Sequence, residues 1–241
     1  MPAHVMVLGC GRSGTSIFGE LFEGLDQYAY RSEPPFREVM AADPSRPNAY
    51  KVPHESAEFP PAPGLSFPLR DFLAAAPGAK IFWIVRHPLD AICSLRIGID
   101  KNWGHHPRPP DWLAWLDRPL LERCAHHWAF LNTAGFVQVE GLARVVHFER
   151  MIADPLAFAH EVCAKVGVDA AANADHLKRW AARVQDTNNA AFVEARTSRD
   201  YSRPDHDRRV RRWLENLTPG EAQGVWPIVS QGARRFGYDA P

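Results

Sequence analysis

The segment Val5–Ser16 combines an apolar run with a glycine-rich turn that carries basic and hydroxyl side chains. It reads V-M-V-L-G-C-G-R-S-G-T-S. The apolar residues Val5–Leu8 predict a buried strand, and the amphipathic run that follows predicts a helix over Thr15–Glu23. Backbone N–H groups at the start of a helix lack partners within it, and the helix dipole is positive there. The turn is therefore expected to bind a phosphate or a similar anion.

This turn differs from the loop that binds nucleoside triphosphates, which reads G-x-x-x-x-G-K-[ST]. Here Gly14 is followed by Thr15 and Ser16 with no lysine, and the basic residue Arg12 comes before the glycine. The turn is thus predicted to bind an anion without the usual lysine. Its candidate ligands are Gly11, Arg12, Ser13, Gly14, Thr15 and Ser16.

A second pair of candidate anion ligands follows the apolar run Lys80–Val85, which predicts a strand covered on both faces. Arg86 stands where this strand ends, and Ser94 lies eight residues later in a helix that Pro88 opens. Ligands of open α/β sheets gather at the carboxyl ends of the strands, so the guanidinium and the hydroxyl could bind a second anionic group. The alternative is that Arg86 pairs with Asp90 while Ser94 only packs.

Strand and helix patterns alternate along the rest of the chain. Further strands are predicted at Tyr28–Tyr30 and Arg144–Phe148. A helix is predicted to begin at Asp154-Pro155, with an acidic N-cap followed by proline, and to end at Gly167. This alternation predicts an α/β fold with a parallel sheet and right-handed crossovers. Seven prolines in Pro44–Pro68 predict a surface loop with little regular structure.

The two ligand segments together resemble the motifs of the sulfotransferases that use 3′-phosphoadenosine 5′-phosphosulfate (PAPS). They read G-R-S-G-T-S and V-R-H-P-x-D-A-x-x-S-L in this chain. The resemblance implies that residues 11–16 bind the 5′-phosphosulfate end of PAPS, and that Arg86 and Ser94 bind its 3′-phosphate. The spelling is closest to the carbohydrate and protein-tyrosine branches of the family. His87 departs from the pattern, because an aspartate is commoner after the arginine.

Two later segments extend the resemblance. Residues 145–155 resemble the strand-to-helix segment of the family, and residues 235–238 resemble its C-terminal ending. The resemblance implies a P-loop-NTPase-like, three-layer α/β/α fold with a central parallel sheet. It also implies a single domain over residues 1–241, with irregular insertions on the acceptor side around 40–78 and 100–120.

Glu33 is the candidate general base. Transfer of a sulfuryl group to a hydroxyl requires removal of the hydroxyl proton, which a positioned carboxylate can accept. Glu33 lies 21 residues after Arg12. The tyrosine-sulfating branch has a glutamate at the same distance after its own loop arginine, and that glutamate acts as the base. Lys51, in Y-K-V-P, resembles a K-x-P element of the same branches. With Arg12, it would stabilise the charge that develops on the oxygen bridging sulfur and phosphate as the phosphate leaves. The alternatives are a solvated acid before two prolines and a surface lysine.

The segment 196–212 contains seven arginines and three aspartates and precedes a tryptophan. Sulfotransferases often place a basic loop before such a residue, over the 3′-phosphate, so the resemblance implies ligands here. The candidates are Arg203, Arg208 and Arg209, among which the sequence does not choose. A solvated charged face is the alternative for most of these arginines.

The overall composition excludes several classes of function. The chain has 28 basic and 28 acidic residues, so its net charge does not favour nucleic acid. Four widely spaced cysteines without a C-x-x-C pair predict reduced thiols and a cytoplasmic protein. No signal peptide and no membrane span are expected. No metal is expected either, because the adjacent histidines 105–106 and 126–127 lack usable ligand spacing.

The sequence therefore predicts transfer of a sulfuryl group from PAPS to a hydroxyl of a carbohydrate or other small molecule. The second product would be adenosine 3′,5′-bisphosphate (PAP). The alternatives are a nucleotide-dependent phosphotransferase and a non-catalytic nucleotide-binding protein on the same fold. The acceptor and the oligomeric state stay open. Trp103, Trp112 and Trp115 could stack on the acceptor or belong to the core.

Overall fold

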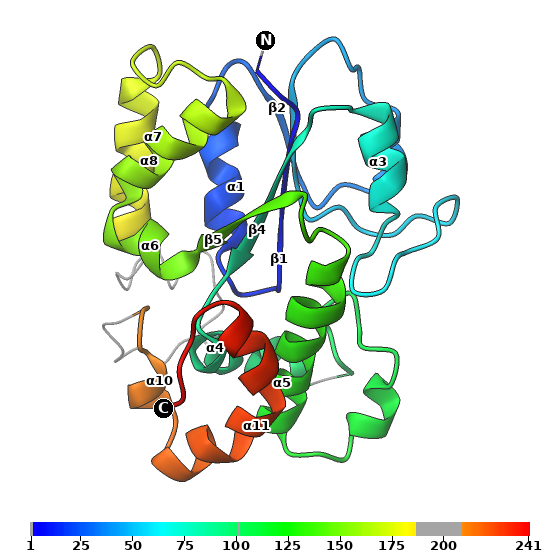
Figure 1. The fold of residues 1–241 in the computed structure, drawn as a ribbon, viewed down its shortest axis with the longest axis vertical. Helices are drawn as coiled ribbons and strands as arrows, with labels where there is room; N and C mark the ends of the chain where they lie inside the picture. The colour runs from blue at the N-terminus through cyan, green and yellow to red at the C-terminus, as the bar shows by residue number, and fades with distance from the viewer. Residues whose placement is uncertain (1, 101, 187–208) are drawn as a thin grey trace.

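The computed structural model describes residues 2–100, 102–186 and 209–241. In this part of the chain, five strands form one parallel sheet in the order β2-β3-β1-β4-β5 (Figure 1). The sheet confirms the predicted α/β fold. Its strands are β1 (Val5–Gly9), β2 (Ala29–Ser32), β3 (Asn48–Lys51), β4 (Lys80–Val85) and β5 (Ala143–His147).

Helices cover both faces of the sheet, which gives three layers (Figure 1). Helices α1, α7 and α8 pack on one face, and α4, α5 and α11 pack on the other. None of the described helices is long and apolar enough to cross a membrane. The helices are α1 (Thr15–Glu23), α2 (Phe36–Met40), α3 (Leu69–Ala75), α4 (Pro88–Asp100), α5 (Leu120–Phe130), α6 (Phe148–Ala153), α7 (Pro155–Val166), α8 (Ala174–Asp186), α10 (Trp213–Asn216) and α11 (Pro219–Arg235), with a 3₁₀ turn η1 (Trp112–Trp115) and a π-helical turn η2 (Leu131–Gly135).

The central strand β1 shows why its sequence is apolar at every position. Val5 and Val7 point into the core beneath α1 and α7, whereas Met6 and Leu8 point into the core beneath α4 and α5. Successive side chains of a strand face opposite sides, so a strand with helices on both faces is apolar throughout. This arrangement leaves the carboxyl end of β1, and the turn after it, at the edge of the sheet where ligands bind in such folds.

The ends of α7 are as the sequence predicts. The side chain of Asp154 accepts a hydrogen bond of 3.0 Å from the N–H of Ala157, and Pro155 is the first helical residue. Gly167 ends the helix in the left-handed conformation, with φ of 77°. The sequence predicts where α7 begins and ends because each of these capping signals depends only on neighbouring residues.

The prediction of an irregular loop over Pro44–Pro68 is wrong in one part. Residues Asn48–Lys51 form the fully buried strand β3, which pairs with β2 on one side and β1 on the other. The strand has four residues, and Pro47 and Pro53 stand close to its two ends. The prolines indicated a loop, whereas pairing with two neighbouring strands determines the structure.

Candidate anion-binding and catalytic site

The turn between β1 and α1 has the geometry of an anion-binding site. Gly14 precedes α1 in the left-handed conformation, with φ of 96°, and none of the described side chains caps the helix. A Cβ at this position would lie 2.5 Å from the ring of Phe148, so the turn needs glycine for both its conformation and its space. The N–H groups of the first helical turn are therefore available to donate hydrogen bonds to an anion.

The side chains of the turn also fit an anion. Ser13 is fully buried, and its hydroxyl has no hydrogen-bond partner among the described residues. A buried hydroxyl without a partner is costly, and an oxyanion in the turn would accept its hydrogen bond. Arg12 adopts a left-handed conformation with φ of 66°, which is strained for a residue with a side chain.

Arg86 lies against the turn from the end of β4. Its Nη1 donates a hydrogen bond of 3.1 Å to the carbonyl of Arg12, and its Nη2 donates one of 2.5 Å to the carbonyl of Arg209. The guanidinium also stacks on Phe148, with Cζ 4.4 Å from the ring centre. The guanidinium therefore bonds to backbone carbonyls of two distant segments, rather than to Asp90 as the alternative interpretation expected.

Asp90 instead holds the segment before α10 against α4. Its carboxylate accepts hydrogen bonds from the backbone N–H groups of Arg211, at 2.8 Å, and Trp213, at 3.0 Å. The intervening residue, Arg212, is 6 % exposed, and its Nη1 donates a bond of 2.9 Å to the hydroxyl of Ser94. Arg212 is therefore the arginine that meets Ser94, and the sequence analysis did not single it out.

Three guanidinium groups thus gather beside the turn, from Arg86, Arg209 and Arg212. Burial, together with the nearby charge of Arg86, lowers the pKa of Arg209 to about 9 and that of Arg212 to about 10. Buried like charges repel one another, so an anion with more than one negative charge would stabilise this arginine cluster. Two other candidates, Arg203 and Arg208, lie outside the described residues.

The turn that carries Arg86 is held by the two later segments of the sequence. The N–H of His87 donates to Glu149 at 2.8 Å, and the hydroxyl of Tyr238 donates to the other oxygen of Glu149 at 2.8 Å. The ring of His87 stacks on Trp213, with centroids 6.1 Å apart. These contacts link the segments around residues 149 and 238 to the turn that carries Arg86.

Glu33 and Lys51 lie together at the carboxyl ends of β2 and β3. The N–H of Glu33 donates to the carbonyl of Lys51 at 2.8 Å, and the Lys51 ammonium pairs with the Glu33 carboxylate. The side chain of Lys51 is 6 % exposed, whereas that of Glu33 is 60 % exposed. Lys51 is therefore not a surface lysine in a loop, as one alternative held, but a buried cation beside the candidate base.

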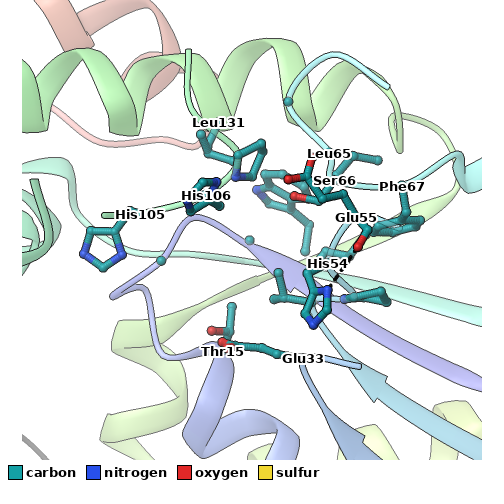
Figure 2. A pocket seen from close by; sticks show the side chains of 18 of the residues that line it. Thr15, Glu33, His54, Glu55, Leu65, Ser66, Phe67, His105, His106 and Leu131 are labelled. Carbon is teal, nitrogen blue, oxygen red and sulfur yellow. Dashed lines mark hydrogen bonds between the residues drawn. The ribbon is translucent and has the colours of Figure 1, made fainter. Parts of the chain in front are cut away.

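A cavity of about 480 Å³ lies next to the turn, and Glu33 and Thr15 line it (Figure 2). One part of its wall is apolar, and includes Leu65, Phe67 and Leu131. No lysine or arginine is among the described residues that line it. Its other polar and charged side chains are His54, Glu55, Ser66, His105 and His106. The cavity offers space for a small molecule whose hydroxyl could reach Glu33.

The tryptophans predicted as possible acceptor contacts do not line this cavity. Trp103 is fully buried and donates to Nδ1 of His127 at 3.1 Å, so it belongs to the core. Trp115 stacks on His126, with centroids 4.0 Å apart. The tryptophan in the cavity wall is Trp83 of β4, which sequence reasoning read only as a strand residue. In the described segments, no three His, Cys, Asp or Glu side chains are grouped to hold a metal.

No protein-family model and no curated protein sequence matches the chain. Solved structures with a similar fold include a mouse sulfotransferase complexed with PAP, with a TM-score of 0.58 and 17 % identity over 96 % of this chain and 84 % of that chain. A sulfotransferase domain from the curacin biosynthetic pathway gives a TM-score of 0.54 and 12 % identity over 100 % and 99 % of the two chains. Retinol dehydratase in complex with androsterone and PAP gives a TM-score of 0.53 and 13 % identity over 100 % of this chain and 84 % of that chain. This chain has the sulfotransferase fold.

Proposed function

We propose that this protein transfers a sulfuryl group from PAPS to a hydroxyl of a small-molecule acceptor and releases PAP. The observation that carries the proposal is the buried arginine cluster beside the anion-binding turn. Arg86 donates to the carbonyl of Arg12, so the cluster and the turn adjoin. Two adjoining anion sites suit a nucleotide that carries phosphate at both its 5′ and 3′ positions. PAP in the solved mouse sulfotransferase with this fold supports the same nucleotide.

The two sites would bind different ends of the nucleotide. The amides at the start of α1, with Arg12 and the hydroxyl of Ser13, would hold the 5′-phosphosulfate end. Ser94 and the arginine cluster would hold the 3′-phosphate, which ADP and ATP lack. Charge-assisted hydrogen bonds from guanidinium groups are the strong type in proteins, so most discrimination between these nucleotides should come from the cluster.

The donor would supply the sulfuryl group. A bond forms between sulfur and the acceptor oxygen as the bond between sulfur and the 5′-phosphate oxygen breaks. Glu33 accepts the proton of the acceptor hydroxyl, and Lys51 orients the Glu33 carboxylate through their ion pair. Arg12 and the amides of the turn offset the negative charge left on the phosphate. To stabilise instead the oxygen that bridges sulfur and the 5′-phosphate, the Lys51 ammonium would have to break its ion pair with Glu33.

The acceptor would occupy the cavity that Glu33 lines. Its apolar wall suits the body of a small molecule, and its polar side chains suit hydroxyl groups. Retinol dehydratase, whose fold is similar, has been solved in complex with androsterone, which supports an acceptor of small-molecule size. A phosphotransferase is less well supported, because Thr15 stands where the triphosphate-binding loop would have its lysine.

Calorimetric titration with PAP and with ADP tests the nucleotide assignment. We expect PAP to bind at least about 10-fold more tightly than ADP, because charge-assisted bonds to the 3′-phosphate are each worth about 1.5–3 kcal/mol. Arg212→Ala should remove about 10-fold or more of the PAP affinity and leave ADP binding unchanged. The matched control is Arg211→Ala, since that neighbouring side chain is exposed. Equal affinities of the wild-type protein for the two nucleotides would overturn the proposal.

A further inference from the structure

His105 brings a ring nitrogen to the anion-binding turn from a distant part of the chain. It follows α4 in sequence, yet its ring borders Gly11, because a Cβ built on Gly11 would lie 3.4 Å from its Nδ1. His105 also lines the cavity together with Glu33 and Thr15, as Figure 2 shows. The Nδ1 edge of the ring is therefore the edge that faces the turn.

The backbone around His105 holds the ring in this place. The other edge of the ring occupies the space beside Gly98, where any side chain would overlap Nε2. The N–H of Gly104 donates to the carbonyl of Gly98 at 2.5 Å. Asn102 and Trp103 take left-handed conformations, with φ of 54° and 52°, which are costly for residues with side chains. Such strain persists only where the surrounding structure enforces it, so the approach of His105 to the turn is well fixed.

A neutral His105 could donate a hydrogen bond to an anion at the turn without adding a positive charge beside Arg12. Burial, aided by the charge of Arg12 and opposed by that of Glu33, lowers the pKa of His105 to about 4. His106 also lowers the pKa, and the ring of the fully buried His127 lies 5.8 Å away. The imidazole is thus neutral near pH 7 and carries one N–H.

The position of that proton follows from the surroundings of the two nitrogens. Nε2 of His105 is buried and has no hydrogen-bond partner among the described residues. A proton on Nε2 would be a buried donor without an acceptor, which is costly. A proton on Nδ1 would instead face the turn, where a bound anion can accept it.

We propose that His105 donates a hydrogen bond through Nδ1 to the sulfuryl group of the donor bound at the turn. This inference rests on the proposed function, because only the sulfated nucleotide carries that group. A neutral donor stabilises negative charge on the sulfuryl oxygens without adding a further cation next to Arg12. His105 then distinguishes PAPS from PAP, whereas the arginine cluster distinguishes both from ADP.

The affinities of the full chain for PAPS and PAP, measured by calorimetry without acceptor, test this role. His105→Phe keeps a ring but loses both nitrogens, and should weaken PAPS binding about 10-fold while PAP binding stays within about twofold. His105→Asn keeps an amide nitrogen in the place of Nδ1 and should retain the ratio of the two affinities within about threefold. His126→Asn removes an imidazole that pairs with Asp111 outside the cavity, and should leave the ratio unchanged.

Three results would overturn the inference. The first is wild-type affinity of His105→Phe for PAPS, and the second is equal weakening of PAPS and PAP, which a purely structural role would give. The third is loss of the ratio in His105→Asn when thermal unfolding shows that the variant is folded. If the wild-type protein does not prefer PAP to ADP, the proposed function itself fails, and the role of His105 with it.

Discussion

At the scale of single residues, the site depends on side chains whose charges compensate one another. Lys51 is buried and pairs with Glu33, so the carboxylate is held at the cavity while most of its surface stays accessible. This pair joins residues that are 18 positions apart, through the parallel neighbours β2 and β3. A general base needs such a fixed position before its proton affinity matters.

Glu33→Gln should lower turnover at least about 100-fold, because positioned acid–base groups contribute about 10²–10⁴ to rates. PAP affinity should stay within about twofold, since no phosphate contact is assigned to this carboxylate. Turnover with a labelled donor and calorimetry with PAP measure the two effects. Glu38→Gln, an exposed carboxylate on α2, is the control. Turnover of Glu33→Gln near the wild-type rate would remove Glu33 from the mechanism.

The four cysteines provide a second prediction at this scale. All four are buried, and Cys10 adjoins the anion-binding turn. Burial raises the pKa of Cys93 and of Cys163 to about 11, and raises the pKa of Cys10 and Cys124 still further. At pH 8 the thiols are therefore protonated and inaccessible. A colorimetric thiol reagent should label none of them in the folded protein and all four in denaturant; rapid labelling of a folded thiol would contradict this.

The individual residues differ in how far the sequence could predict them. The turn residues 11–16 are close in sequence, and they form one turn directly before α1, as the spacing implies. Arg212 is one of seven arginines in its segment, and only the docking of that segment on Asp90 brings it to Ser94. His105 likewise reaches Gly11 through a bend that no local pattern encodes. Long-range packing, rather than residue type, selects both.

At the scale of secondary-structure elements, the predicted and observed bounds agree where local chemistry decides. The bounds of α1 and β4 coincide with the prediction, because a glycine turn and an unbroken apolar run define them. The strand β3 was missed, because its four residues lie among prolines and are ordered by neighbours on both sides. The π-helical turn η2 has no sequence signal comparable to a cap or a proline.

The start of α1 gives a prediction for an element. Gly14→Ala should destabilise the protein by about 1–3 kcal/mol, because alanine is strained in the left-handed conformation and its Cβ would meet the Phe148 ring. Gly224→Ala is the matched control within α11, where a Cβ would meet none of the described atoms within 4 Å. It should stabilise the protein by about 0.5–1 kcal/mol. Urea denaturation measures both, and an equal effect of the two changes would contradict the argument.

At the scale of the whole molecule, the site is assembled from segments that are far apart in sequence. The turn after β1, the ends of β2, β3 and β4, the segment after α4 and the segment before α10 all contribute side chains. The parallel sheet brings the strand ends to one edge, which the sequence pattern could predict. The segments that close over this edge could not be predicted, because their positions depend on buried polar contacts such as those of Asp90 and Glu149.

Three histidines are buried or half-buried in their neutral form, which makes the stability of the fold depend on pH. Burial lowers the pKa of His105 to about 4 and lowers that of His127 well below the usual value near 6.5. The pKa of His87 is also lowered by burial, although Asp90 and Glu149 oppose the shift. Between pH 4 and 6.5 the unfolded chain then binds more protons than the folded chain, so stability rises with pH across this range.

The free energy of unfolding should therefore be greatest above about pH 6.5 and fall as the pH drops towards 5, by up to about 1.4 kcal/mol per pH unit for each buried neutral histidine. Urea denaturation at pH 7, 6 and 5 measures the slope. His105→Asn removes one titrating group, so its slope should be smaller than that of the wild type by up to about 1.4 kcal/mol per unit. A free energy of unfolding that stays constant from pH 7 to 5 would show that these imidazoles are accessible to protons in the folded protein, and would contradict the closed packing around His105.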